Sequence, residues 1–210
     1  LGLNGAGKTT TFRILTGQVK ATTDVVNFSG TNIRDALANG CAGNSIGYCP
    51  QADALDHFLT PVEHLRIYAN LRGIPQLHIS KVTISPINIY FINTCFALKM
   101  VKESINKFQL QPHANMPVQA LSRGNRRKLC LAIAMLGNPK LILLDEPTSG
   151  LDPQSRRYVC QNIQDAIRDR RSILLTSHSM EECDILCSRL AIMVNGRFKC
   201  IGSPQYLKHK

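Results

Sequence analysis

Residues 2–9 read GLNGAGKT and fit the pattern G-x-x-x-x-G-K-[ST], a loop that connects a strand to a helix. The glycines of such a loop let backbone N–H groups turn inward around phosphate oxygens, where a side chain would block the approach. The Lys8 ammonium would pair with β- and γ-phosphates, and the Thr9 hydroxyl would bind Mg²⁺. The stretch therefore predicts a nucleotide site. Its expected phosphate-binding residues are Gly2, Asn4, Gly5, Gly7, Lys8, Thr9 and Thr10.

Strand-like and helix-like patterns alternate along the rest of the chain. A helix is expected directly after the loop, so that its positive N-terminal end would face the phosphates. Further helices are expected at 61–73, 99–108, 123–136, 153–170 and 180–188. Strands are expected at 24–30, 45–49, 141–144 and 172–176, and a hairpin at 190–201 with Asn195-Gly196 as its turn. This alternation predicts an α/β fold with a parallel sheet flanked by helices.

The length and composition are those of one globular domain. The chain has 210 residues, of which 44% are hydrophobic and 19% charged, which argues against a disordered or coiled-coil protein. It contains no uninterrupted apolar run of about 18 residues, so we expect no membrane span in it. It starts at Leu1 without Met or a secretory leader, and its second residue already opens a motif. We therefore expect the sequence to be a piece of a longer protein.

Basic residues outnumber acidic ones by 25 to 14, and the excess is concentrated in residues 106–210. Such an excess fits a nucleic acid, an anionic lipid surface or a phosphorylated ligand as partner, or only a solvated face. For the cluster Arg168, Arg170 and Arg171 we favour a simpler interpretation. It falls where the helix from Pro153 should end, and cations there offset the helix dipole.

The eight cysteines form no recognisable metal or disulfide pattern. The chain has no C-x-x-C pair, and Cys183 and Cys187 have no histidine nearby at zinc-finger spacing. A domain of this size needs no disulfide to fold. We therefore expect buried, reduced thiols, which implies a domain on a cytosolic face.

Two adjacent carboxylates, Asp145 and Glu146, follow the continuous apolar run 141–144. Such a run is typical of a buried central strand, and ligands of α/β folds bind at the carboxyl ends of the strands. An aspartate in this place can hold Mg²⁺, and an adjacent glutamate can polarise an attacking water. The pair therefore indicates a catalytic site.

The complete set of motifs resembles the nucleotide-binding domain of an ATP-binding cassette (ABC) transporter. In family order, the chain has the phosphate loop (Walker A), a Q-loop glutamine, a signature sequence, the acidic motif, a D-loop and a switch histidine. The motifs after the phosphate loop are Gln51, LSRGN at 121–125, Asp145-Glu146, SGLD at 149–152 and His178. The stretches YCPQADAL at 48–55, RRKL at 126–129 and SHSMEEC at 177–183 are similar to the A subfamily, and AIMVNGRF at 191–198 to its C-terminal cassette.

The resemblance implies a P-loop NTPase fold with a helical subdomain. The whole chain, 1–210, would be one nucleotide-binding domain, truncated at its N-terminus because the two strands that usually precede the phosphate loop are absent. Residues 1–51 and 137–210 would form the ATPase core, and 52–136 the helical subdomain that carries the signature. With these strands the aromatic residue that stacks on adenine is absent too, so we expect the isolated 210 residues to bind ATP poorly and to be inactive.

The resemblance also implies the mechanism. ATP would bind the phosphate loop of one domain, while Ser122 and Gly124 of a second domain close over the γ-phosphate. Thr9, Gln51 and Asp145 would hold Mg²⁺, and the catalytic residues would be Glu146, His178 and Gln51. Glu146 would position the attacking water, and His178 would sense the γ-phosphate.

The implied setting is an integral membrane transporter, with this domain on the cytosolic face. Its expected partners are a second nucleotide-binding domain, the transmembrane domains and, through them, a lipid-like substrate; no nucleic acid is expected. Two alternatives stay open. One is a non-transport ABC ATPase that acts on the ribosome or DNA, and the other is a degenerate cassette that binds nucleotide without turnover.

The sequence departs from the family pattern in two further places. Arg123 replaces the first glycine of the signature, which predicts a weakened but not abolished nucleotide sandwich. The uncharged segment 82–98 makes the stretch between Gln51 and Ser122 longer than the family spacing by roughly twenty residues, and long insertions in compact domains are uncommon. We therefore expect this insert to be foreign to the fold.

Overall fold

The structure is a computed structural model that describes residues 1–23, 25–28, 30–33, 35, 45–74 and 86–208, with only the course of the backbone for 86–96. The chain folds into two compact units, which are described here one at a time. The first unit consists of residues 1–52 and 140–210, and the second of residues 53–139.

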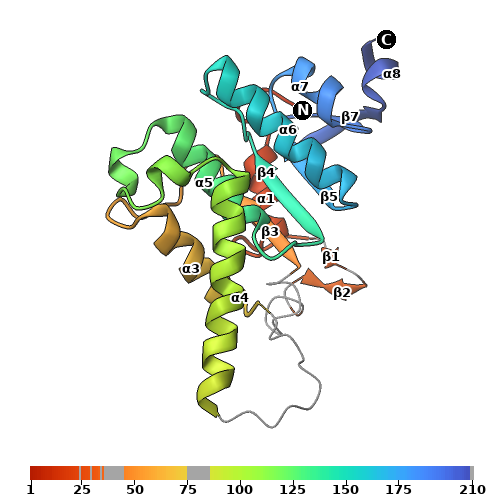
Figure 1. The fold of residues 1–210 in the computed structure, drawn as a ribbon. Coiled ribbons are helices and arrows are strands. Elements are labelled where there is room, and N and C mark those ends of the chain that lie inside the picture. Colours follow the sequence, from red (N-terminus) through yellow and green to blue (C-terminus); the bar gives the residue numbers. More distant parts are fainter. Residues whose placement is uncertain (24, 29, 34, 36–44, 75–85, 209–210) are drawn as a thin grey trace. The chain divides into compact units, whose positions relative to one another are not determined.

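The first unit is built on a parallel sheet of the three strands β3 (Ile46–Cys49), β4 (Leu141–Asp145) and β5 (Ser172–Thr176), in the order β3-β4-β5 (Figure 1). The middle strand β4 is the most deeply buried, since Ile142, Leu143 and Leu144 are inaccessible to solvent. Isoleucine and leucine side chains are typical of a strand that is buried on both faces. The predicted α/β fold with a parallel sheet is therefore confirmed.

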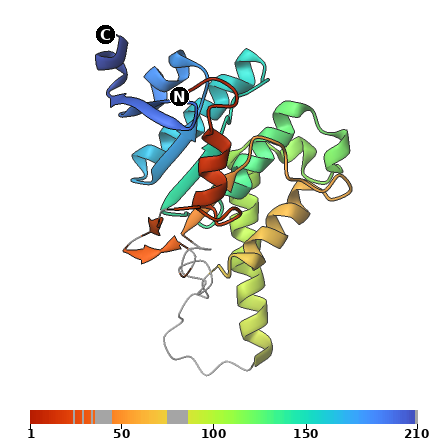
Figure 2. The ribbon, with the colours of Figure 1, turned by 180° about the vertical axis from the view of Figure 1, so that it is seen from behind.

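Helices lie on both faces of this sheet. Helix α1 (Lys8–Leu15) lies against β4 on the face turned to the viewer in Figure 2, and α6 (Pro153–Arg168) lies on the opposite face, which Figure 1 shows. Helix α6 starts where the sequence predicts, because Asp152 accepts a hydrogen bond from Ser155 N at 2.9 Å and Pro153 occupies the first turn. The helices α7 (Met180–Leu186) and α8 (Pro204–Lys208) complete the unit.

The hairpin of β6 (Leu190–Val194) and β7 (Arg197–Gly202) turns at Asn195-Gly196 as predicted. Both turn residues have positive φ, 49° and 74°, which a tight two-residue hairpin turn requires. Leu1 lies beside β6, because its amino group donates to the Ala191 carbonyl and its own carbonyl accepts from Met193 N, each at 2.8 Å. A cavity of about 570 Å³ is lined by residues of β5, β6, α1 and α7.

A smaller hairpin pairs β1 (Asn27–Phe28) with β2 (Thr31–Asn32). Next to it, the side chain of Ile33 is buried against Val26, Phe28 and Ile46. This cluster attaches the hairpin to the start of β3.

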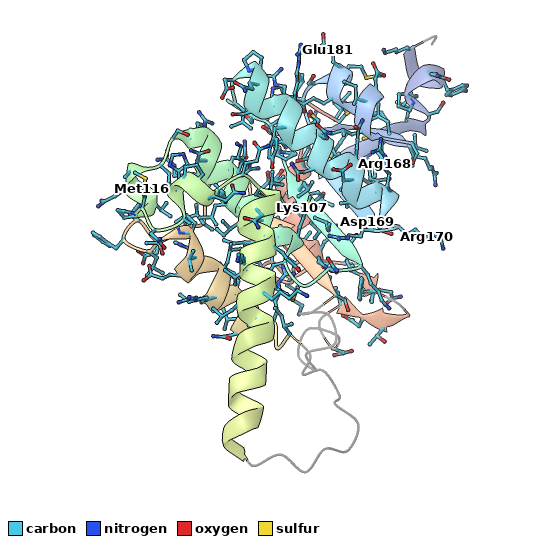
Figure 3. The ribbon with its side chains drawn as sticks, viewed as in Figure 1. Lys107, Met116, Arg168, Asp169, Arg170 and Glu181 are labelled. Carbon is cyan, nitrogen blue, oxygen red and sulfur yellow. The ribbon has the colours of Figure 1, made fainter. Side chains whose placement is uncertain are left out.

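Basic residues gather at the C-terminal end of α6, where Figure 3 shows Arg168, Asp169 and Arg170. The helix ends at Arg168, two residues before the predicted end, because Arg170 has left-handed backbone angles with φ 60°. Arg168 lies 3.3 Å from the Asp165 carboxylate, and Arg171 lies 3.2 Å from that of Asp169. Part of the positive charge is thus paired locally.

The second unit is helical. It contains α3 (Pro61–Leu71), α4 (Pro86–Lys107), the 3-10 turns η1 (Gln111–His113) and η2 (Val118–Ala120), and α5 (Arg123–Met135). Helix α3 begins with a capping box, in which Thr60 Oγ1 accepts from Glu63 N and the Glu63 carboxylate accepts from Thr60 N. The side chain of Ser122 caps α5 by accepting from Asn125 N at 3.2 Å.

Asp53 and Arg72 make polar contacts that pair charges and satisfy a helix end within the second unit. Asp53 pairs with Arg126 and Arg127, so the basic N-terminal half of α5 has an acidic partner. Arg72 donates to the carbonyls of Ala134 and Leu136 at the other end of α5. The pKa of Arg72 is lowered by its burial, and these bonds replace its lost hydration.

Helix α4 is longer than predicted. The sequence predicts its start at residue 99, whereas the backbone is helical from Pro86, and residues 82–85 lie outside the described part of the chain. Proline is favoured in the first turn of a helix, and no further proline or glycine interrupts the segment before Lys107. The segment from Pro86 is therefore helical although its apolar residues follow no clear helical period. Within the described ranges, no helix is both long and apolar enough to span a membrane.

Gly2 is required by packing as well as by its place in the phosphate loop. A Cβ atom added there would lie 2.6 Å from the Met193 carbonyl oxygen, a backbone atom of β6 that has no rotamer to change. We expect Gly2→Ala to lower the free energy of unfolding by about 1–3 kcal/mol in urea denaturation, the usual result of overpacking. Leu3→Ala is the control, because the Leu3 side chain is exposed and its loss should change stability by less than about 0.5 kcal/mol. Equal effects of the two variants would contradict this account.

Candidate functional site

The candidate site lies where the three parallel strands of the first unit end. Cys49, Leu144 and Leu175 are paired across the sheet, so the chain leaves all three strands at the same edge. Gln51 follows β3 by two residues, Glu146 comes directly after β4, and His178 comes two residues after β5. The strand register therefore brings together three residues that are far apart in the sequence, at positions 51, 146 and 178.

Glu146 is the centre of this arrangement. Its Oε1 lies 3.3 Å from Lys8 Nζ, and its Oε2 accepts a hydrogen bond from Gln51 Nε2 at 3.2 Å and lies 3.5 Å from His178 Nδ1. The side chain is only 6% exposed. A buried carboxylate is stable only when it is paired, and Lys8 supplies the opposite charge. The structure thus brings together three predicted catalytic residues and the phosphate-loop lysine.

The phosphate loop folds around Lys8. The Lys8 ammonium donates to the carbonyls of Gly2 and Leu3, at 2.7 and 3.2 Å, so the side chain returns across its own loop. Gly5 and Gly7 have φ of 80° and 102°, angles that side-chain-bearing residues rarely adopt. Gly7 is the N-cap of α1, so the first amides of that helix face the loop. This geometry suits an anion at the helix N-terminus.

Thr9 and Thr10 occupy the first turn of α1, and Asn4 is exposed at the tip of the loop. Thr10 is exposed and Thr9 is partly so. The three predicted residues are therefore accessible from solvent, Thr9 in part.

Asp145 and Glu146 are held by Thr176, the last residue of β5. Thr176 Oγ1 donates to Asp145 Oδ1 and accepts from Glu146 N at 3.0 Å, while the Thr176 carbonyl also accepts from Glu146 N at 3.2 Å. Asp145 is completely buried. Glu146 has φ 46°, so the chain turns sharply between the two carboxylates. The two acidic side chains can therefore serve different roles although they are adjacent in sequence.

Sequence reasoning did not identify Thr176 as part of the site. A signal was present, because a threonine at the end of the strand next to β4 pairs in register with Asp145. It also missed a buried cluster of Thr148, Ser177 and Glu182 behind the site, for which neither composition nor motif spacing gave an indication.

The residues predicted to hold Mg²⁺ fit that ion in their chemistry. Thr9, Gln51 and Asp145 offer hydroxyl, amide and carboxylate oxygens, the donors that Mg²⁺ prefers. Among the described side chains no cluster of three or more histidine, cysteine or acidic residues could form a complete metal cage.

Ser122 and Gly124 lie in the second unit, at the N-terminal end of α5. Ser122 is the N-cap, and Gly124 lies in the first turn. Arg123, between them, is exposed. This helix end therefore presents a hydroxyl and a positive dipole end, with an arginine side chain beside them.

Comparisons with known proteins agree with the motifs. The family model described as "ABC transporter" matches residues 1–149. The chain is 46% identical over 212 residues to ATP-binding cassette sub-family A member 13 of Homo sapiens, covering 100% of this chain and 4% of that protein. It is 46% identical over 210 residues to the retinal-specific phospholipid-transporting ATPase ABCA4 of Bos taurus, covering 100% of this chain and 8% of that protein. The chain thus spans less than a tenth of the length of these two relatives.

Two solved structures have the same fold. An ATP-binding subunit of an ABC transporter superposes with a TM-score of 0.79 at 24% identity, covering 100% of this chain and 79% of that one. A dimeric ATP-binding cassette in a post-hydrolysis state, bound to ADP and phosphate, superposes with a TM-score of 0.78 at 20% identity, covering 97% of this chain and 83% of that one.

The position of Thr176 predicts the effect of its removal. In Thr176→Val the buried Asp145 carboxylate and Glu146 N–H lose their hydroxyl partner, which should lower the free energy of unfolding by about 1–3 kcal/mol. Thr176→Ser keeps the hydroxyl, so its free energy of unfolding, measured by urea denaturation, should fall by clearly less than that of Thr176→Val. A serine variant as unstable as the valine variant would show that the methyl group, and not the hydroxyl, matters.

Proposed function

Because this chain belongs to the ABC transporter family, we propose that it binds and hydrolyses ATP to power transport across a membrane. The observation that carries the proposal is the contact of one buried carboxylate, Glu146, with Lys8, Gln51 and His178. In this arrangement a general base, a phosphate-binding cation and a polar sensor meet at the end of a rigid strand. Phosphoryl transfer depends mainly on such positioning and on charge stabilisation.

The phosphate loop binds the nucleotide. Backbone amides around Gly5 and Gly7 and the N-terminus of α1 surround the phosphate oxygens, and Lys8 neutralises their charge. Thr9, Gln51 and Asp145 would hold Mg²⁺, which would neutralise charge on the phosphates. Asn4 and Thr10, which are exposed, contribute polar contacts to the nucleotide.

Glu146 orients the attacking water, and His178 contacts the γ-phosphate. Lys8 lies against Glu146 at 3.3 Å, so the arrival of γ-phosphate would give the lysine a second anionic partner and leave the carboxylate to accept a proton. Ser122 and Gly124 of a second cassette complete the site from the far side. The division into an ATPase core, 1–51 with 137–210, and a helical subdomain, 52–136, is supported by the two compact units.

The transported substrate is a lipid. This proposal rests on the likeness to A-subfamily proteins, one of which is named a phospholipid-transporting ATPase. The transmembrane domains and the second cassette are then further partners, and the chain acts at the cytosolic face as part of an integral membrane protein. The retained contact between Glu146 and His178 favours turnover over a degenerate cassette, and the transporter family match favours transport over action on the ribosome or DNA.

The test of this function is Glu146→Gln in the full-length transporter, reconstituted in phospholipid vesicles. ATP hydrolysis should fall by about 10²- to 10⁴-fold because the general base is lost, while ATP binding persists. Transport of a labelled phospholipid between the leaflets should stop as well. Glu103→Gln, on the exposed side of α4, is the control and should leave hydrolysis unchanged. Undiminished hydrolysis in the Glu146 variant would refute the assignment.

The signature arginine gives a second prediction. Arg123→Gly restores the close approach of the α5 N-terminus to phosphate, so the KM for ATP should fall by about threefold, or ~0.7 kcal/mol. Arg123→Ala separates the two causes, because it removes the charge but keeps a Cβ atom. An unchanged KM for ATP in both variants would mean that the Arg123 side chain points away from the nucleotide.

A further inference from the structure

Glu182 is a buried carboxylate that takes no part in the nucleotide site described above. It is 8% exposed, and each of its oxygens accepts a hydroxyl hydrogen bond. Thr148 Oγ1 donates to Oε1, and Ser177 Oγ donates to Oε2 at 2.8 Å. Thr148 and Ser177 are buried too. Displacement of either hydroxyl would leave a buried charged acceptor without its donor, which is costly in a site that excludes water.

Glu182 is the third residue of α7, the position from which a glutamate side chain completes a capping box. Its hydrogen bonds here differ from those of a capping box. The segment Ser179-Met180-Glu181-Glu182 has the S-x-x-E pattern, in which the glutamate usually accepts from the backbone N–H of the cap residue. Here Ser179 N donates to Ser177 Oγ at 3.0 Å instead, and Ser177 Oγ donates to Glu182. The Ser177 hydroxyl thus lies between the Ser179 N–H and Glu182 Oε2, and Glu182 Oε1 accepts from Thr148.

These bonds join three segments that border the site. Thr148 lies two residues after Glu146, in the loop that follows β4, and Ser177 directly precedes His178, in the loop that follows β5. Arg156, in the first turns of α6, places its Nε 3.8 Å from Glu182 Oε1. Asp152, the last residue of the D-loop sequence 149–152, is the N-cap of α6.

We propose that Glu182 is a positioning residue that fixes the distance between Glu146 and His178 and couples the D-loop to the histidine loop. The proposal rests on the proposed ATPase function. Glu182 does not touch the reacting atoms; it acts through Thr148 and Ser177. Because both loops hydrogen-bond to one carboxylate, a displacement of the loop after β4 is transmitted to His178.

The expected size of the effect follows from the geometry. Glu146 Oε2 and His178 Nδ1 lie 3.5 Å apart, and their loops are also joined at Thr176 on the strand side of the site. Loss of Glu182 removes the tie on the other side. A misplacement of about 1 Å in a catalytic group can lower a rate by about 100-fold. The loss should therefore fall on kcat, because nucleotide binding depends on the phosphate loop, which Glu182 does not contact in any described bond.

The experiment uses the full-length transporter in phospholipid vesicles and measures kcat and KM for ATP. Glu182→Ala should lower kcat by about 10- to 100-fold and change KM by less than about threefold. Glu182→Gln keeps an acceptor for one hydroxyl, and the other hydroxyl can accept from the new amide, so it should restore most of kcat. Thr148→Val should lower kcat as well, and its effect should be largely absent in a Glu182→Ala background.

Two matched controls separate positioning from folding. Glu181→Gln changes the preceding glutamate, which Figure 3 shows at the surface and which is exposed, and it should leave kcat unchanged. Val159→Ala opens a cavity under α6 and lowers thermal stability without touching the loops, so its kcat per folded protein should also be unchanged.

The proposal is overturned if Glu182→Ala behaves like Val159→Ala, if KM rises in step with the fall in kcat, or if the Thr148 and Glu182 effects are additive. Failure of the proposed function would look different. In that case the unmodified transporter would not hydrolyse ATP, or Glu146→Gln would leave hydrolysis intact, whatever the Glu182 variants do.

Discussion

The buried strand β4, paired in parallel with β3 and β5, is the constraint on which the rest of the site depends. Its apolar side chains fill both faces of the sheet, and a shift of one residue would turn Leu143 and Leu144 to the opposite faces. The register is therefore fixed by packing. Because all three strands run in the same direction, their ends coincide, and this brings Gln51 and His178 within 3.2 and 3.5 Å of the Glu146 carboxylate.

The ion pair of Glu146 with Lys8 connects the two halves of the site. A carboxylate this deeply buried is tolerated because Lys8 lies beside it, and Lys8 in turn is held by two carbonyls of its own loop. The phosphate loop and the strand end are thus joined through one ion pair. Any anion that enters the loop competes with Glu146 for the same ammonium, so binding of phosphate and release of the carboxylate are linked.

Much of the fold could be predicted from local sequence. The β4 strand, the caps at Thr60, Ser122 and Asp152 and the Asn195-Gly196 turn depend on a few adjacent residues whose preferences agree with the final structure. The site residues were named from motifs, and the structure brings those of the first unit together. What the sequence did not predict depends on distant partners. Gly2 meets a carbonyl of β6, Glu182 meets Thr148, and the start of α4 at Pro86 had no apolar period to mark it.

The left-handed backbone of Glu146 has an evolutionary consequence. A φ of 46° is more favourable for glycine or asparagine than for glutamate, so the residue that we propose as the general base occupies a position that its backbone disfavours. Replacement by glycine would relieve this strain but would remove the carboxylate that contacts Lys8, Gln51 and His178. On the proposed function, a cassette no longer selected for turnover would gain stability from a glycine here and lose hydrolysis.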